Sequence, residues 1–142
     1  MKNSRGTRKK FQKVEFKYNN EKVEFLGRVP DSLMSRLYSN AIAFIFPSLY
    51  EGFGLPPLEA ISFGCPVIGS DIEVLHEIYG NSMLYFDPTN IRSVVEAINK
   101  ICNNSEVRTE LIREGKKILN KYSFEISVNQ LYYLIKSVKY EP

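Results

Sequence analysis

The sequence predicts an α/β fold in which a Rossmann-like parallel sheet carries helices on both faces. Short runs of strand-forming residues alternate along the chain with segments of helical periodicity. Two of these runs, 42–46 and 66–69, are almost continuously apolar, which is typical of parallel strands buried on both faces. The chain has 142 residues, of which 44% are hydrophobic and 25% charged, so its size and composition fit one globular domain.

The first strand and the first helix lie directly after a basic N-terminal stretch. Residues 23–26 are strand formers, and Gly27 ends the run. A helix over about 33–40 follows, with Asp31 or Ser32 as its expected cap.

A loop rich in glycine and proline separates the second strand from the next helix. Pro47 closes the strand at 42–46, and residues 48–57 form the loop. The short helix at 58–63 is expected to end at Gly64, because glycine readily adopts the left-handed conformation of helix ends.

The second half of the chain continues the alternation and then becomes helical. The third strand is 66–69 and the fourth is Met83–Phe86, with a helix between them that Asp71 caps and Gly80 ends. Three further helices are expected at 91–102, 107–122 and 124–139. Ser123 caps the last one, and its apolar residues are expected to face inward: Ile126, Leu131, Leu134, Ile135 and Val138.

The positive charge of the chain is concentrated at one end. Residues 1–22 hold eight Lys or Arg and two Glu, a balance of +6, whereas residues 23–142 hold 11 basic and 14 acidic side chains, a balance of −3. We therefore divide the chain into a basic segment, 1–22, and a folded domain, 23–142. The segment is expected to be disordered or to add a hairpin strand at 13–18, where a helix fits equally well. It carries no nucleic-acid recognition motif, so contact with an anionic membrane surface is the alternative to a solvated tail.

Two cysteines and a single histidine leave little room for metal or disulfide chemistry. Nothing in the sequence pairs Cys65 with Cys102, which suits a reduced, cytoplasmic protein, and a site of His and Cys ligands is nearly excluded. Cys65 is expected to pack beside the pocket, Cys102 in a helix core and His76 on a helix surface. The longest apolar run, 41–47, is too short to cross a membrane, and no signal peptide is visible.

The candidate site is the segment 47–60, PSLYEGFGLPPLEA, in which Glu51 and Glu59 bracket two glycines and two prolines. The backbone N–H groups of Gly54 and Leu55 are expected near a helix N-terminus, which attracts phosphate. A carboxylate beside such a site can accept hydrogen bonds from sugar hydroxyls. Because ligands of parallel sheets bind beyond the carboxyl ends of the strands, this loop predicts a phosphosugar or nucleotide pocket.

This loop resembles the motif of two glutamates, separated by seven residues, of glycosyltransferases of family four, also called group one. Further matches lie at the distances usual in that family and cover about 23–133: FLGRV at 25–29, Leu37-Tyr38 and Ala41, FPS at 46–48, GCPVI at 64–68 and FDP at 86–88. The resemblance implies the C-terminal, donor-binding domain of a GT-B enzyme, N-terminally truncated. Enzymes of that architecture have two Rossmann-like domains.

The resemblance implies transfer of a sugar, with retention of configuration, from a nucleotide-diphosphate sugar to a glycan or lipid-linked saccharide. Glu51 is then the catalytic candidate, through contact with hydroxyls of the donor sugar; the spacing does not mark it as a general acid or nucleophile. Glu59 would bind the ribose, and Arg28 and Val29 would meet the base through their backbone. The loop backbone would face the sugar and the diphosphate at Gly52, Phe53, Gly54 and Leu55. Neither a metal nor another cofactor is expected.

Two side chains of the loop, Tyr50 and Phe53, either line the sugar site or pack against the fold. The resemblance does not decide between these two roles for either residue.

The resemblance also predicts what this chain lacks. In the family, two more strand–helix units open the domain and supply an Arg and a Lys that neutralise the departing diphosphate, and a separate domain holds the acceptor. We therefore expect the chain alone to be inactive and to work with a portion that carries the acceptor domain; the alternative is a truncated, non-catalytic nucleotide-sugar-binding module. Without those units, residues 23–26 either pair with 13–18 or leave a sheet of three strands.

Overall fold

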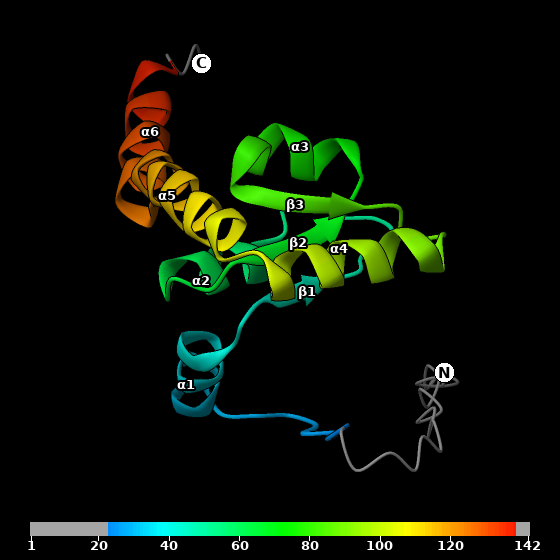
Figure 1. The fold of residues 1–142 in the computed structure, drawn as a ribbon. Helices are drawn as coiled ribbons and strands as arrows, with labels where there is room; N and C mark the ends of the chain where they lie inside the picture. The colour runs from blue at the N-terminus through cyan, green and yellow to red at the C-terminus, as the bar shows by residue number, and fades with distance from the viewer. Residues whose placement is uncertain (1–22, 139–142) are drawn as a thin grey trace, which may run out of the picture.

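The computed structural model describes residues 23–138, with the exception of the side chain of Phe124. Figure 1 shows a small central sheet with helices packed around it. The predictions for the basic segment, 1–22, including the strand or helix at 13–18, lie outside the described residues.

The sheet has three parallel strands in the order β1-β2-β3, which are β1 (Phe44–Phe46), β2 (Val67–Ser70) and β3 (Met83–Phe86). In the register of the sheet, Ile68 of β2 lies beside Ile45 on one side and Leu84 on the other. The predicted α/β class and parallel sheet are therefore confirmed. Of the two arrangements left open for the first strand, the sheet of three strands matches the described residues.

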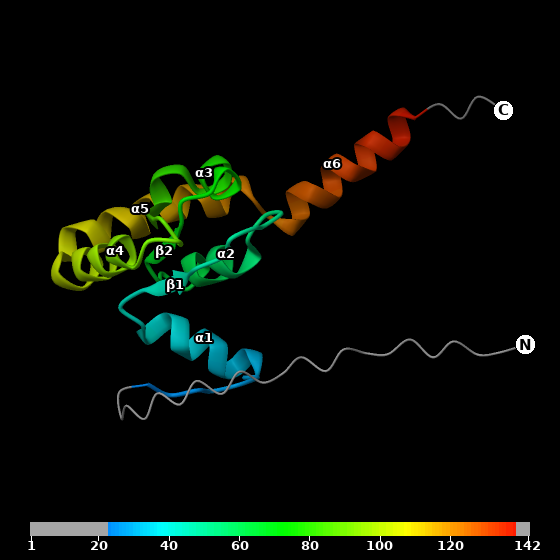
Figure 2. The ribbon, with the colours of Figure 1, turned by 90° about the vertical axis from the view of Figure 1, so that its right-hand side faces the viewer.

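The predicted strand at 23–26 is wrong. These residues form no regular element, and Phe25 is 69% exposed. They belong to a segment that lies on the side of helix α1 (Asp31–Asn40) away from the sheet (Figures 1 and 2). A strand needs a neighbour for its backbone hydrogen bonds, and no described strand offers one at this place.

The predicted burial of the second strand on both faces is also wrong. β1 is three residues long, its outer residues Phe44 and Phe46 are half-buried, and Ile45 is 38% exposed. β1 is an edge strand because only β2 pairs with it among the described residues. By contrast, every residue of β2 is buried, as predicted for a central strand.

Three helices of the first half begin at residues that differ from those predicted. Helix α1 has Pro30 as its N-cap without a side-chain bond, and Asp31 is already helical. Helix α2 (Leu55–Ser62) begins three residues earlier than predicted, because proline is well suited to the first turn of a helix. Helix α3 (Glu73–Tyr79) has Ile72, not Asp71, as its N-cap, and a 3-10 helix, η1 (Gly80–Ser82), follows it.

The three C-terminal helices agree well with the prediction: α4 (Ile91–Asn103), α5 (Ser105–Lys121) and α6 (Phe124–Ser137). Ser123 caps α6 as expected, since its hydroxyl accepts a hydrogen bond of 3.1 Å from the backbone N–H of Ile126. The inward orientation expected for the apolar residues of α6 is wrong, because all the side chains described from 125 to 138 are exposed. Figure 2 shows α6 extending away from the body of the fold.

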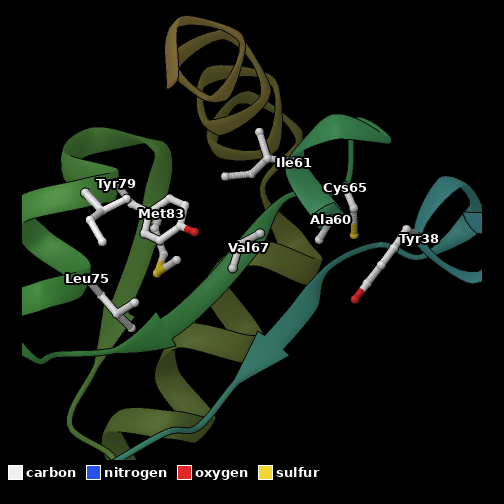
Figure 3. Close-up of a cluster of buried hydrophobic side chains, with 9 residues drawn as sticks. Tyr38, Ala60, Ile61, Cys65, Val67, Leu75, Tyr79 and Met83 are labelled. Carbon is white, nitrogen blue, oxygen red and sulfur yellow. The ribbon is translucent and has the colours of Figure 1, made fainter. Parts of the chain in front are cut away.

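The two faces of the sheet carry separate hydrophobic clusters. Because side chains alternate along a strand, Val67 of β2 belongs to one cluster and the neighbouring Ile68 to the other. The first cluster joins the sheet to α2 and α3 (Figure 3) and contains Tyr38, Ala60, Ile61, Cys65, Val67, Leu75, Ile78, Tyr79 and Met83. The second joins it to α4 and α5 and contains Ile68, Phe86, Ala97, Ile101 and Leu111. Helices therefore cover both faces, as the sequence predicts.

The two cysteines lie in different surroundings. Cys65 is packed in the first cluster, as expected, but it precedes β2 and does not line the cavity described below, so its expected place beside the pocket is wrong. Burial raises the pKa of its thiol to about 11. Cys102 is exposed on α4, so its predicted place in the helix core is wrong. Cys102 follows the buried Ile101 on α4. Successive side chains on a helix differ in direction by about 100°, so Cys102 points away from the core that Ile101 faces.

Candidate functional site

The candidate site lies at the carboxyl edge of the sheet, in the loop that joins β1 to α2. All three strands are parallel, so their carboxyl ends share this edge. A cavity of about 330 Å³ opens here between the loop and the beginning of α3. Its lining consists of Leu49, Tyr50, Glu51, Ile72, Glu73, Val74 and Glu77. This volume is at the lower end of the range of small-molecule pockets.

Glu51 is a half-buried member of the cavity lining, and Ser48 holds its carboxylate. The Ser48 hydroxyl lies 2.8 Å from Oε1 of Glu51 and 3.0 Å from the carbonyl oxygen of Tyr50. A hydroxyl has one proton, and its bond to an ionised carboxylate is the stronger of the two. Glu51 is therefore held in one orientation at the wall of the cavity.

A row of backbone N–H groups follows Glu51. Within the described part of the chain, the N–H groups of Gly52, Phe53, Gly54 and Leu55 donate to no other backbone or side-chain group. The next two residues of α2 are prolines and have no N–H. Free amides at a helix N-terminus attract an anion, so this row suits a phosphate or diphosphate, and the predicted phosphate contact stays a prediction.

Gly54 turns the chain from the loop into α2. It is buried and has a φ of +83°, a left-handed conformation that glycine adopts without strain. A Cβ atom at this position would lie 3.0 Å from Cδ2 of Leu75. The carbonyl oxygen of Gly54 accepts a hydrogen bond of 2.5 Å from the hydroxyl of Tyr79 on α3. Sequence reasoning missed this partner, because 25 residues separate it from Gly54.

The side chains of Phe53 and Tyr50 have different surroundings. Phe53 packs edge to face on Tyr122, with ring centroids 5.3 Å apart, at the joint between α5 and α6. It is therefore a packing residue, whichever role its backbone has. Tyr50 is 89% exposed and lines the cavity, so of the two rings it is the one available to a ligand.

Glu59 does not line the cavity that holds Glu51. It is exposed on α2, and its negative charge adds to burial in raising the pKa of Tyr38 on α1. The row of free amides thus lies between Glu51 and Glu59 along the chain.

Arg28 and Val29 lie in the irregular segment that precedes α1. Their predicted contact with a nucleotide base remains a prediction. His76 is exposed on α3, as expected; its Nε2 lies 2.6 Å from Oδ1 of Asp71, and its ring stacks on Tyr85.

The cavity is acidic. Among the described residues, three glutamates line it, Glu51, Glu73 and Glu77, and no Lys, Arg or His does. Within residues 23–138, no group of three or more His, Cys, Asp or Glu side chains is placed to hold a metal ion. No helix in this same range has the length and apolar character that a membrane span requires.

Comparisons with known proteins point to one family. A family model described as "Glycosyl transferases group 1" matches residues 5–118. The chain is 39% identical over 105 residues to the O-antigen chain mannosyltransferase RfbU of Salmonella typhimurium, a match that covers 74% of this chain and 29% of that protein. It is 35% identical over 108 residues to O-antigen chain mannosyltransferase B of Escherichia coli, covering 76% of this chain and 28% of that protein.

The fold is similar to that of a sucrose-phosphate synthase from Thermosynechococcus elongatus. The TM-score is 0.71 at 25% identity, and the match covers 82% of this chain and 31% of the synthase. The chain therefore spans about three tenths of the length of each of these three proteins.

Proposed function

This chain belongs to the glycosyl transferases of group 1, and we propose that it is the donor-binding part of a retaining enzyme. The reaction we propose is transfer of a sugar from a nucleotide-diphosphate sugar to a glycan or a lipid-linked saccharide. The observation that carries the proposal is the loop after β1, in which the anchored Glu51 and the free amides of 52–55 follow one another at the carboxyl edge of the sheet.

Each part of the donor has a proposed place along this loop. The amides from Gly52 to Leu55 would bind the diphosphate, which supplies the acceptor oxygens that they lack. Glu51 would accept hydrogen bonds from hydroxyls of the donor sugar in the cavity, and Glu59 would bind the ribose. The roles of Arg28 and Val29 at the base are proposed on family resemblance alone.

We propose mannose as the transferred sugar, because both curated relatives described above are named as O-antigen chain mannosyltransferases. The product would accordingly be a bacterial polysaccharide of the O-antigen kind. The protein would act in the cytoplasm, with its basic segment 1–22 in peripheral contact with an anionic membrane.

The acidity of the cavity supports our proposal that this chain alone has negligible transferase activity. A departing diphosphate needs positive charge for its stabilisation, and the described lining of the cavity supplies three carboxylates and no cation. Backbone amides are uncharged. They can bind the diphosphate of the donor, but they do not neutralise the negative charge that develops on it as it leaves the sugar. A portion carrying basic residues and the acceptor site would complete the enzyme, and no metal would be needed.

The proposal is tested by titrating the chain with UDP-, GDP- and ADP-sugars in a calorimeter, with Glu59→Ala as the diagnostic variant. We expect one nucleotide class to bind and Glu59→Ala to weaken it about ten-fold or more, since hydrogen bonds to a charged group contribute roughly 1.5–3 kcal/mol. Glu96→Ala removes an exposed glutamate from α4, outside the site, and should bind as the unmodified chain does. Binding of no donor at all, or equal binding by Glu59→Ala, would contradict the proposal.

A further inference from the structure

We propose that Tyr79 is a positioning residue of the donor site, which acts through the carbonyl group of Gly54 to fix the direction of the Leu55 amide. The inference rests on the proposed function of the loop, in which that amide binds the donor diphosphate. It assigns a role to a buried hydroxyl that lies outside the loop.

Tyr79 contacts the loop from the interior of the protein. Its side chain is fully buried on α3, and Figure 3 shows it extending from that helix beside Met83, with its hydroxyl oxygen directed away from the helix. The hydroxyl donates to the Gly54 carbonyl oxygen at 2.5 Å. Burial also raises the pKa of this hydroxyl, so it remains a donor at every pH at which the fold is expected to be stable.

The planarity of the peptide bond transmits this contact to the surface. The carbonyl of Gly54 and the N–H of Leu55 belong to the same trans peptide unit, so they point in opposite directions. A hydrogen bond that holds the carbonyl toward the interior therefore holds the N–H away from it. Leu55 is the first residue of α2, and its N–H has no partner within the described residues.

The turn at Gly54 needs such a support. Glycine at a φ of +83° has more conformational freedom than any other residue, and rotation of its peptide unit would redirect the Leu55 amide. Leu75, one turn before Tyr79 on α3, closes the space beside the Cα atom of Gly54. Packing by Leu75 and the hydrogen bond from Tyr79 thus restrict the same peptide unit.

Tyr85 offers a matched control on the other side of α3. Its hydroxyl lies 3.1 Å from the carbonyl oxygen of Leu75 and 2.8 Å from that of Gly80, and its one proton donates to these backbone oxygens and not to the loop. Tyr79→Phe and Tyr85→Phe each remove one hydroxyl that bonds to backbone, and only Tyr79→Phe releases Gly54.

The experiment compares these two variants of the full chain by ¹⁵N NMR. We expect the amide resonance of Leu55 to move in Tyr79→Phe and to stay in place in Tyr85→Phe. We also expect Tyr79→Phe to bind UDP, GDP or ADP about three- to ten-fold more weakly, the loss typical of one hydrogen bond. The corresponding nucleoside, which has no diphosphate to reach Leu55, should bind both variants equally.

The outcomes separate this inference from the proposed function. If the unmodified chain binds no nucleoside diphosphate, the proposed function fails, whereas the Leu55 resonance still decides whether Tyr79 positions the amide. An unchanged Leu55 resonance in Tyr79→Phe overturns the inference, as does an equal loss of diphosphate and nucleoside affinity. If Tyr79→Phe does not fold, the test is the exchange of the Tyr79 hydroxyl proton with water in the unmodified chain. Slow exchange supports the hydrogen bond to Gly54. Exchange as fast as that of the exposed Tyr50 hydroxyl overturns it.

Discussion

The carboxylate of Glu51 has a fixed orientation because the hydroxyl of Ser48, three residues earlier, donates to it. The pair belongs to one loop, so its geometry depends on local chain conformation and little on the packing of distant helices. A sugar hydroxyl that binds Glu51 would meet a carboxylate already held in position.

At the scale of single residues, we therefore expect Ser48→Ala to weaken the binding of the donor sugar. The loss should be about three- to ten-fold, as for one hydrogen bond at a partly exposed site. The measurement is the difference in affinity between a nucleotide-diphosphate sugar and the same nucleoside diphosphate, because only the sugar reaches Glu51. Ser62→Ala is the matched control, since that hydroxyl donates to the backbone oxygen of Glu59 and not to a carboxylate. An equal effect of both changes would contradict the role of Ser48.

Residues whose role is local could be predicted from the sequence, and residues whose role depends on the tertiary fold could not. Two glycines before two prolines suffice to predict a turn into a helix N-terminus, and Gly54 has the expected left-handed conformation. Tyr79 was missed because nothing in the sequence of α3 shows which loop its hydroxyl meets. Cys102 was misplaced because its position is one step around the helix from the buried Ile101.

At the scale of elements, hydrophobic periodicity predicted the helices more reliably than the edges of the sheet. α4 and α5 were found to within two residues, since long periodic patterns determine a helix. The run at 23–26 was taken for a strand, yet strand formation depends on a neighbouring strand that a local pattern cannot reveal. The same limit explains the wrong prediction for α6. Its apolar residues predicted burial, but burial needs a surface for the helix to pack on, and a local pattern does not reveal one.

The exposure of α6 leads to a prediction about its stability. A 14-residue helix with no described buried side chain lacks the packing that normally stabilises a helix of this length. We expect backbone amides in the middle of α6 to exchange with deuterium at least about a hundred-fold faster than those of α5 around the buried Leu111. Hydrogen exchange followed by NMR measures both helices in one sample. Equal protection of α5 and α6 would show that α6 packs on something in solution.

At the scale of the whole molecule, the two hydrophobic clusters explain why three short strands suffice to support the fold. β2 contributes side chains to both clusters, and helices cover both of its faces. The sequence predicted this arrangement correctly because strands and helices alternate in it. The sequence did not predict the number of strands uniquely, because that number depends on which segments of the chain pair along the edge of the sheet.

Stability should fall in alkaline solution because of a buried acid in the first cluster. The thiol of Cys65 has its pKa raised from 9.0 to about 11 by burial, so the folded state favours its neutral form. The contribution of the neutral thiol to the free energy of unfolding is complete below pH 9. It is lost as the pH rises to 11, and the loss is of the order of 2 kcal/mol. Urea unfolding between pH 8 and pH 11 measures this loss.

Two variants identify the source of the alkaline loss. Cys65→Ala should lower stability at pH 8 and make the fall toward pH 11 shallower, whereas Cys102→Ala, at an exposed thiol, should leave the fall unchanged. A fall of the same size in Cys65→Ala would assign it to other groups, of which Tyr79 and Tyr85 are the first candidates because burial raises the pKa of both hydroxyls.

The position of β1 at the edge of the described sheet has a consequence for handling the protein in solution. One side of this strand pairs with β2, and the other presents backbone N–H and carbonyl groups next to the exposed Ile45. Natural sheets shield such edges with charged residues or proline, and here Pro47 stands just beyond the strand while its three residues are Phe, Ile and Phe. Within residues 23–138 no strand covers this apolar edge. Such an edge is a template on which strands of other molecules can assemble, so the tendency of this chain to aggregate should increase with its concentration.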